Sequence, residues 1–129
     1  MDFVIIVVVL ALIQFIAFGI LVGRARAKFN VAAPASSGDP IFERYNRVHM
    51  NTLEQLVCFL PAIFVYSHVA NANIAAGLGV VYLIGRLVYL RSYIADPASR
   101  GIGFVLTMLP TLFMLLASLV IVIRNLFTG

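Results

Sequence analysis

Two series of polar side chains interrupt a chain that is otherwise strongly apolar. Each series recurs mainly at steps of three and four residues, the spacing that places side chains on one face of a helix. The first comprises Arg47, Asn51, Glu54, Gln55 and Cys58, and the second comprises Tyr82, Arg86, Tyr89 and Tyr93. Arginine presents a planar fork of N–H donors suited to carboxylates, and the arginines here outnumber the single carboxylate, Glu54. The pattern predicts a site for an anionic ligand on these two helices.

Arg100 adds a further cation in an unusual position. Asp96-Pro97 is typical of a helix start, because Asp accepts free backbone N–H groups as N-cap and Pro fits the first helical position. We therefore expect Arg100 in the first turn of that helix, beside free N–H groups and the positive end of the helix dipole. A cation normally avoids that end, so its presence favours an anion held nearby. The alternative is an interfacial anchor that binds a lipid phosphate.

The polar residues of the second and third helices also have structural explanations that need no ligand. Glu54 can pair with Arg47 or Arg86 and so hold two helices together. For Tyr82, a place in the apolar core is the favoured interpretation. His49 is expected to be a polar residue at the membrane edge, because no second His or carboxylate lies at metal-ligand spacing. The sequence therefore predicts no metal site.

The amino-acid composition indicates whether the helices that carry these residues lie in water or in a membrane. Of 129 residues, 63% are hydrophobic and 11% are charged, and the mean hydropathy is +1.07. A soluble domain is about half apolar and about a quarter charged. The length suits one domain, residues 1–129. The one cysteine, Cys58, excludes a disulfide framework and is expected to be a small packing residue. These features predict an integral membrane protein.

Four stretches are long and apolar enough to cross a bilayer, which takes about 20 residues. Their predicted limits are 3–23, 47–69, 74–94 and 101–123. Asp39-Pro40 repeats the cap-and-proline signal, so the second helix is expected to begin near Pro40, and the segment Ser67–Asn73 favours a turn. Pro61 and Pro110 are expected to kink their helices without ending them. The first stretch has its basic cluster on the far side, which favours a retained helix over a cleaved signal peptide.

Basic residues predict the orientation of these four spans. Eight of the nine lie in or near the first and third loops: Arg24, Arg26, Lys28, Arg44, Arg47, Arg86, Arg91 and Arg100. Only Arg124 lies at the opposite end. By the positive-inside tendency, the first and third loops are expected in the cytoplasm, and both termini on the opposite side.

Two sequence blocks resemble the signature of the membrane-associated eicosanoid and glutathione metabolism (MAPEG) family, which includes the microsomal glutathione transferases and leukotriene C synthase. The first block is FERYNRVHMNTLE, residues 42–54. The second is VYLIGRLVY, residues 81–89, followed by Tyr93 and Arg100. The resemblance runs without gaps from about Arg26 to the fourth span.

This resemblance implies a left-handed bundle of four transmembrane helices that assembles as a homotrimer. It also implies a glutathione site between adjacent subunits, open to the cytoplasm and the membrane. The residues that match glutathione-binding positions are Arg26, Arg47, His49, Asn51, Glu54, Arg86, Tyr89 and Tyr93. Arg26 is expected to come from the first helix of a neighbouring subunit. Arg100 matches the arginine that stabilises the glutathione thiolate in the catalytic members.

The chain departs from the leukotriene synthase branch at two positions. Gln55 stands where that branch has a tyrosine, and Ala27 stands where it has a second arginine. Leukotriene synthesis is therefore not the expected activity. Retention of Arg100, together with the Arg47, Asn51 and Glu54 set, favours a catalytic member of the family over an inert one.

The leading hypothesis is a membrane-bound glutathione transferase or peroxidase, with glutathione as co-substrate and a lipophilic electrophile or lipid hydroperoxide as second substrate. A thiol has a pKa near 8.5 and attacks only as thiolate, so the Arg100 guanidinium would favour the reactive form. Membrane lipids and further copies of the chain are the other expected partners, and no nucleic acid is expected. One alternative is a non-catalytic lipid-binding or scaffold protein. Another is a small proton-coupled exporter that uses Glu54 as proton carrier, although neighbouring arginines would hold that carboxylate ionised.

Overall fold

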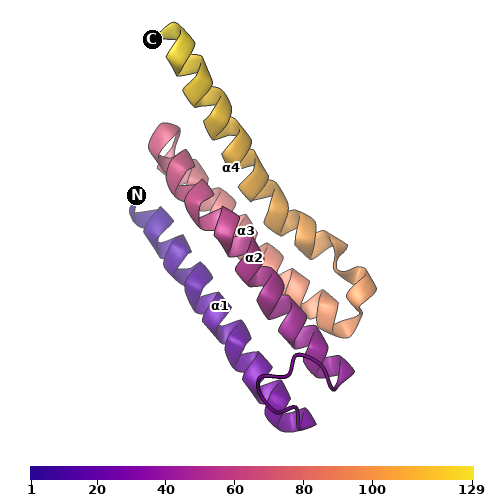
Figure 1. Ribbon diagram of the computed structural model, residues 1–129. Helices are drawn as coiled ribbons and strands as arrows, with labels where there is room; N and C mark the ends of the chain where they lie inside the picture. Colours follow the sequence, from indigo (N-terminus) through magenta and orange to yellow (C-terminus); the bar gives the residue numbers. More distant parts are fainter.

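The computed structural model describes all 129 residues and consists of four long α-helices joined by loops (Figure 1). In chain order the elements are α1 (Asp2–Phe29), α2 (Pro40–Val69), α3 (Ala72–Ala95), the 3₁₀ turn η1 (Pro97–Ser99) and α4 (Gly101–Thr128). The helices alternate in direction, so both termini lie at one end of the bundle. The α1–α2 and α3–α4 connections lie at the other end, called the loop end below (Figure 1). The predicted all-α fold class is confirmed.

All four helices are long and apolar enough to cross a membrane. Each of the stretches 3–23, 47–69, 74–94 and 101–123 lies within one helix. Large apolar side chains also cover the outside of the bundle: Ile20 is 60% exposed, Val57 67% and Leu119 56%. A surface of this kind suits lipid and not water, so the chain is an integral, multi-pass membrane protein.

Short polar side chains begin α2 and α3, as their sequences predict. Asp39 Oδ1 accepts hydrogen bonds from the backbone N–H groups of Ile41, at 2.8 Å, and Phe42, at 3.0 Å. The prediction that the second helix begins near Pro40 is therefore confirmed. Asn71 Oδ1 accepts from the Ile74 N–H at 2.9 Å and starts α3 after a two-residue break.

The start of α4 differs from the expectation that Asp96 is its N-cap. Asp96 instead caps the η1 turn, where its Oδ1 accepts from the Ala98 N–H at 3.1 Å. Helix α4 begins only at Gly101, so Arg100 itself occupies the N-cap position. The Asp96-Pro97 pair thus begins a tighter 3₁₀ turn in place of the α-helix, and such turns are common at helix ends. The cation still lies at the N-terminus of α4.

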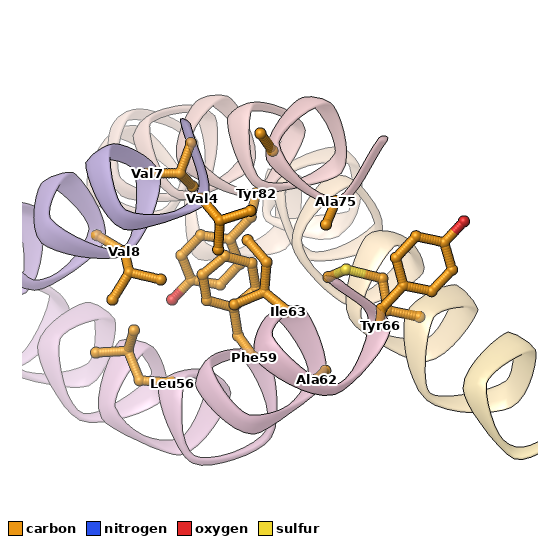
Figure 2. Close-up of a cluster of buried hydrophobic side chains, with 13 residues drawn as sticks. Val4, Val7, Val8, Leu56, Phe59, Ala62, Ile63, Tyr66, Ala75 and Tyr82 are labelled. Carbon is orange, nitrogen blue, oxygen red and sulfur yellow. The ribbon is translucent and has the colours of Figure 1, made fainter. Parts of the chain in front are cut away.

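The core is built mainly from α1, α2 and α3, with Met114 from α4, around a pair of stacked rings. The rings of Phe59 on α2 and Tyr82 on α3 lie 3.8 Å apart at 10°, and Val4 and Val7 of α1 pack beside them (Figure 2). The interpretation of Tyr82 as a core aromatic is confirmed. Cys58 is exposed, so its interpretation as a packing residue is wrong: it lies one position before buried Phe59, on the outer face of α2.

Glycines let α3 and α4 approach closely near the loop end. A Cβ on Gly85 would lie 2.8 Å from the backbone of Thr107, and a Cβ on Gly103 would collide with the backbone of Tyr89. Close backbone approach through small residues is a common way for membrane helices to pack. Helices α2 and α4 continue through Pro61 and Pro110, as expected. The tight contact fixes the start of α4 against the last turns of α3.

Candidate binding site

A cavity of about 480 Å³, called the polar pocket here, opens between α2, α3 and the start of α4. Drug-sized ligands occupy cavities of roughly 300–1,000 Å³. The lining residues of the polar pocket are Arg47, Met50, Asn51, Glu54, Tyr89, Tyr93, Arg100 and Phe104. Helical spacing explains the grouping, because residues three and four apart share a face of α2 and of α3.

The structure thus brings together six of the nine residues that the sequence predicts for the site. Arg47, Asn51 and Glu54 come from α2, Tyr89 and Tyr93 come from α3, and Arg100 comes from the junction before α4. The two tyrosine rings stack with centroids 5.6 Å apart at 25°. Arg100 donates a hydrogen bond to the Pro97 carbonyl at 2.9 Å, which fixes its side chain near the helix start.

The charges on the pocket wall are two guanidinium groups and one carboxylate. Arg47, Arg100 and Glu54 are all exposed. The ion pair considered between Glu54 and Arg86 does not form: Nη1 and Nε of Arg86 bond to neutral oxygens, and its buried Nη2 has no hydrogen-bond partner. The wall therefore offers separate positive and negative groups to a ligand that carries both acidic and basic functions.

Arg86 does not line the polar pocket but lies fully buried behind it. Its Nη1 donates to Asn51 Oδ1 at 2.8 Å and to Thr52 Oγ1 at 3.2 Å, and its Nε donates to Thr107 Oγ1 at 2.9 Å. Its guanidinium carbon lies 4.4 Å from the centroid of the Tyr89 ring, a cation–π contact. Arg86 therefore joins α2, α3 and α4 and holds two pocket residues in place.

The other two predicted residues lie on the far side of α2, toward α1. The His49 ring stacks on Phe15 of α1, with centroids 4.4 Å apart at 17°. Arg26 lies over the Phe42 ring at 4.7 Å and donates to the Ala35 carbonyl at 2.7 Å. Within one chain, neither side chain lines the polar pocket. Gln55 is buried and does not line it either.

Sequence reasoning missed the apolar lining of the pocket and the partners of Arg86. Met50 and Phe104 line the pocket, yet neither residue type is distinctive in an apolar helix. Thr52 and Thr107 donate to carbonyls four residues earlier, at 2.8 and 2.9 Å, while accepting from Arg86. A threonine in a membrane helix commonly bonds to its own backbone. Only the position of Arg86 in a charge-poor span signals the need for such partners.

The amino-acid sequence is similar to a described family and to several known proteins. A family model described as the MAPEG family matches residues 3–120. An uncharacterised protein of Synechocystis is 39% identical over 117 residues, which cover 91% of this chain and 85% of that protein. The microsomal glutathione S-transferase 2 of Homo sapiens is 35% identical over 91 residues, or 70% of this chain and 62% of the relative.

Leukotriene C4 synthase of Bos taurus is 35% identical over 83 residues, which cover 64% of this chain and 55% of the synthase. The chain therefore spans less than two thirds of the length of this synthase and of the human transferase. All six predicted residues of the polar pocket lie within the part that the family model matches.

Proposed function

This chain belongs to the MAPEG family, and from that premise and the chemistry of the polar pocket we propose that it is a membrane-bound glutathione transferase. The observation that carries the proposal is the convergence of Arg47, Glu54 and Arg100 with two phenols in one cavity of about 480 Å³. Glutathione has two carboxylates, one ammonium group and one thiol. The wall of the pocket offers a complementary group for each kind of charge.

The side chains suggest how the tripeptide is held. Arg47 suits a glutathione carboxylate, because a guanidinium can bind both carboxylate oxygens. Glu54 suits the ammonium group. Asn51, which Arg86 holds at 2.8 Å, and the two tyrosine hydroxyls suit the polar backbone of the peptide. Arg86 acts behind this wall as a positioning residue, and Arg26 and His49 are proposed to join the pocket from a neighbouring subunit.

Arg100 is the proposed catalytic residue. It lies at the N-cap of α4, where free backbone N–H groups and the helix dipole add to its positive charge. A thiolate near this point is stabilised relative to the thiol, which lowers the pKa of the thiol. The thiol therefore loses its proton to water at a pH below the ordinary pKa of a free thiol. The sulfur then bonds to the electrophilic carbon of the second substrate, and the leaving group departs with the bonding electrons.

The second substrate is proposed to be lipophilic and to enter from the bilayer. Met50 and Phe104 form an apolar part of the pocket wall, and Leu53 and Val57 continue an exposed apolar face on α2. Reduction of a lipid hydroperoxide by two glutathione molecules is a further reaction that such an arrangement can support. The assembly is proposed to be a homotrimer, with the loop end and the pocket in the cytoplasm.

Replacement of Arg100 by Ala tests the catalytic proposal. The absorbance of the bound thiolate near the ultraviolet edge is titrated against pH, and the absence of Trp lowers the protein background. We expect the pKa of the bound thiol to rise toward its free value of about 8.5. Turnover of chlorodinitrobenzene should fall, whereas glutathione affinity should fall only modestly because Arg47 remains.

Two further variants complete this experiment. Arg100→Lys should recover part of the turnover, because a point charge still stabilises sulfur although the fork geometry is lost. Arg91→Ala removes an exposed cation that does not line the pocket and should match the wild type. Equal titration curves for the wild type and Arg100→Ala would assign Arg100 an anchoring role only. Glutathione binding without any turnover would indicate an inert, lipid-binding member of the family.

A further inference from the structure

A second cavity, of about 460 Å³, lies between the end of α1 and the start of α2 at the loop end of the bundle. It shares no lining residue with the polar pocket. We call it the basic cavity, and its lining residues are Leu21, Arg24, Ala25, Lys28, Phe29, Ile41 and Tyr45. The function proposed above makes no use of these residues.

The positive charge of the basic cavity is uncompensated. Arg24 and Lys28 lie four residues apart on α1, so both side chains project from one face of the helix. No acidic residue lines the cavity. Arg26, which lies between them in sequence, instead donates to the Ala35 carbonyl at 2.7 Å. The Lys28 ammonium lies 5.4 Å from the centroid of the Phe29 ring, at the edge of the apolar lining.

The rest of the basic cavity is apolar, and this apolar surface continues along α1. Leu21, Ala25, Phe29 and Ile41 form most of its wall. Ala17, Ile13 and Leu10 follow Leu21 toward the N-terminus at spacings of three and four residues, so they extend the same face. Ile13 is 55% exposed and Leu10 46% exposed. A ligand can therefore place a charged group at the loop end and a long apolar chain along α1.

We propose that the basic cavity binds the headgroup of an anionic phospholipid. The phosphate lies between Arg24 and Lys28, with the Tyr45 hydroxyl as a further donor, and an acyl chain follows the exposed face of α1 toward the middle of the bilayer. A free phosphate would use the cations but leave the apolar wall open to water. A zwitterionic lipid would use the wall but carry no net charge to match two cations. The site is independent of glutathione.

Lipid binding to the detergent-solubilised protein tests this inference. The midpoint of thermal unfolding is measured with increasing dioleoylphosphatidylglycerol or dioleoylphosphatidylcholine, and native mass spectrometry counts the lipids retained. We expect the anionic lipid to bind more tightly and to raise the midpoint more. Arg24→Gln and Lys28→Gln should each weaken its binding about fivefold, the effect of about one basic residue near an anionic surface. Both side chains are exposed, so folding should be unchanged.

The controls separate the site from general surface charge and from simple anion binding. Arg91→Gln removes one exposed charge from α3, outside the basic cavity, and should leave lipid affinity unchanged. If this variant loses as much affinity as Lys28→Gln, the lipid responds to overall charge and the proposed site is wrong. Inorganic phosphate should not raise the unfolding midpoint. Stabilisation by phosphate equal to that by the lipid, or equal binding of the two lipids, would also overturn the proposal.

Discussion

Arg86 shows how a membrane helix can hold a fully buried cation without an acid. Inserting an arginine at the centre of a membrane span costs about 2.5–3.5 kcal/mol of free energy on an insertion scale, so such residues need partners. Arg86 finds them in Asn51, Thr52 and Thr107, which are all neutral, and in the face of the Tyr89 ring. Because no carboxylate neutralises it, its charge also adds to the positive potential behind the polar pocket. For the proposed glutathione site, this potential would favour an anionic ligand that Arg86 does not touch.

Replacing Arg86 by Lys should separate charge from geometry. Lysine keeps the charge but cannot bond to α2 and α4 at once as the guanidinium fork does. We expect the loss of the bond to Thr107 to destabilise the protein by about 1.5–3 kcal/mol, the usual value for a hydrogen bond to a charged group. Glutathione affinity should fall as well, because Asn51 is less firmly held. Thermal unfolding and a binding titration measure the two effects.

Arg86→Met extends this test, because methionine removes the charge but keeps a long, unbranched side chain. It should weaken glutathione binding more than Arg86→Lys, since the potential behind the pocket is lost together with the hydrogen bonds. Equal affinities in the lysine variant, the methionine variant and the wild type would show that Arg86 contributes to packing alone.

Replacing Glu54 by Gln should affect binding and leave folding intact. Glu54 is exposed on the pocket wall and is not bonded to Arg86, so its charge contributes little to the stability of the chain. We expect glutathione affinity to fall up to about fivefold, as for loss of a solvent-accessible ion pair. The unfolding midpoint measured without ligand should stay near that of the wild type. Isothermal titration and thermal unfolding provide the two readouts.

Glu43→Gln is the matched control, because it removes one negative charge from α2 outside the pocket. Its glutathione affinity should equal that of the wild type. A strongly destabilised Glu54→Gln variant would indicate that the carboxylate is buried against another subunit.

At the scale of elements, the contact between α3 and α4 decides the shape of the pocket. Gly103 has no room for a Cβ because the Tyr89 backbone lies directly against it. Gly103→Ala should push the start of α4 away from α3 and destabilise the protein by about 1–3 kcal/mol, as expected for overpacking. Arg100 would move with α4, so turnover should fall as well. Thermal unfolding and chlorodinitrobenzene turnover measure this change.

Gly101→Ala is the control, because a Cβ at that position meets no atom within 4 Å. It lies nearer to Arg100 in sequence than Gly103 does, and yet it should leave stability and turnover close to wild type. Equal losses in the two variants would attribute the effect to backbone flexibility before α4 and not to the contact with α3.

The elements were more predictable from sequence than the packing between them. Caps such as Asp39 and Asn71 act within a few residues, so the starts of α2 and α3 follow from local chemistry. The η1 turn was missed because Asp96 and Pro97 cap a 3₁₀ turn as well as an α-helix. Spacing placed five pocket residues on common faces, and the cap signal placed Arg100 near the start of α4. Spacing also put Arg86 on the face of Tyr89, but its burial behind the pocket depends on how α2 and α4 pack against α3. Helical periodicity carries no information about those neighbours.

At the scale of the whole molecule, α1 contributes nothing to the polar pocket of its own chain. Helices α2, α3 and α4, together with Arg100 just before α4, supply every lining residue, while Arg26 near the end of α1 lies over Phe42. The proposed homotrimer explains this arrangement, because a neighbouring α1 would bring its Arg26 to the open side of the pocket. The mass of the detergent-solubilised protein should correspond to three chains.

Mixed assemblies should test the shared site directly. Arg26→Ala and Arg100→Ala subunits, each nearly inactive alone, should recover part of the turnover when they are co-expressed. Some pockets would then combine an intact Arg100 with an intact Arg26 from the neighbour. In the control, Arg47→Ala and Arg100→Ala subunits should show no recovery, because both residues line the pocket of the same chain. Equal recovery in both mixtures, or none in either, would contradict a site shared between subunits.

The uncharged hydrogen-bond acceptors of Arg86, which are Asn51, Thr52 and Thr107, also have a consequence for biosynthesis. The chain is made from its N-terminus, so α2 enters the bilayer before α3. Asn51 and Thr52, which both accept from Arg86 Nη1, are therefore in place when the nascent segment that carries this cation leaves the translocon. Thr107 follows one helix later on α4 and accepts from Arg86 Nε at 2.9 Å. The order of the helices along the chain thus supplies partners for Nη1 of the arginine as it inserts, and the last helix to be synthesised adds the partner of Nε.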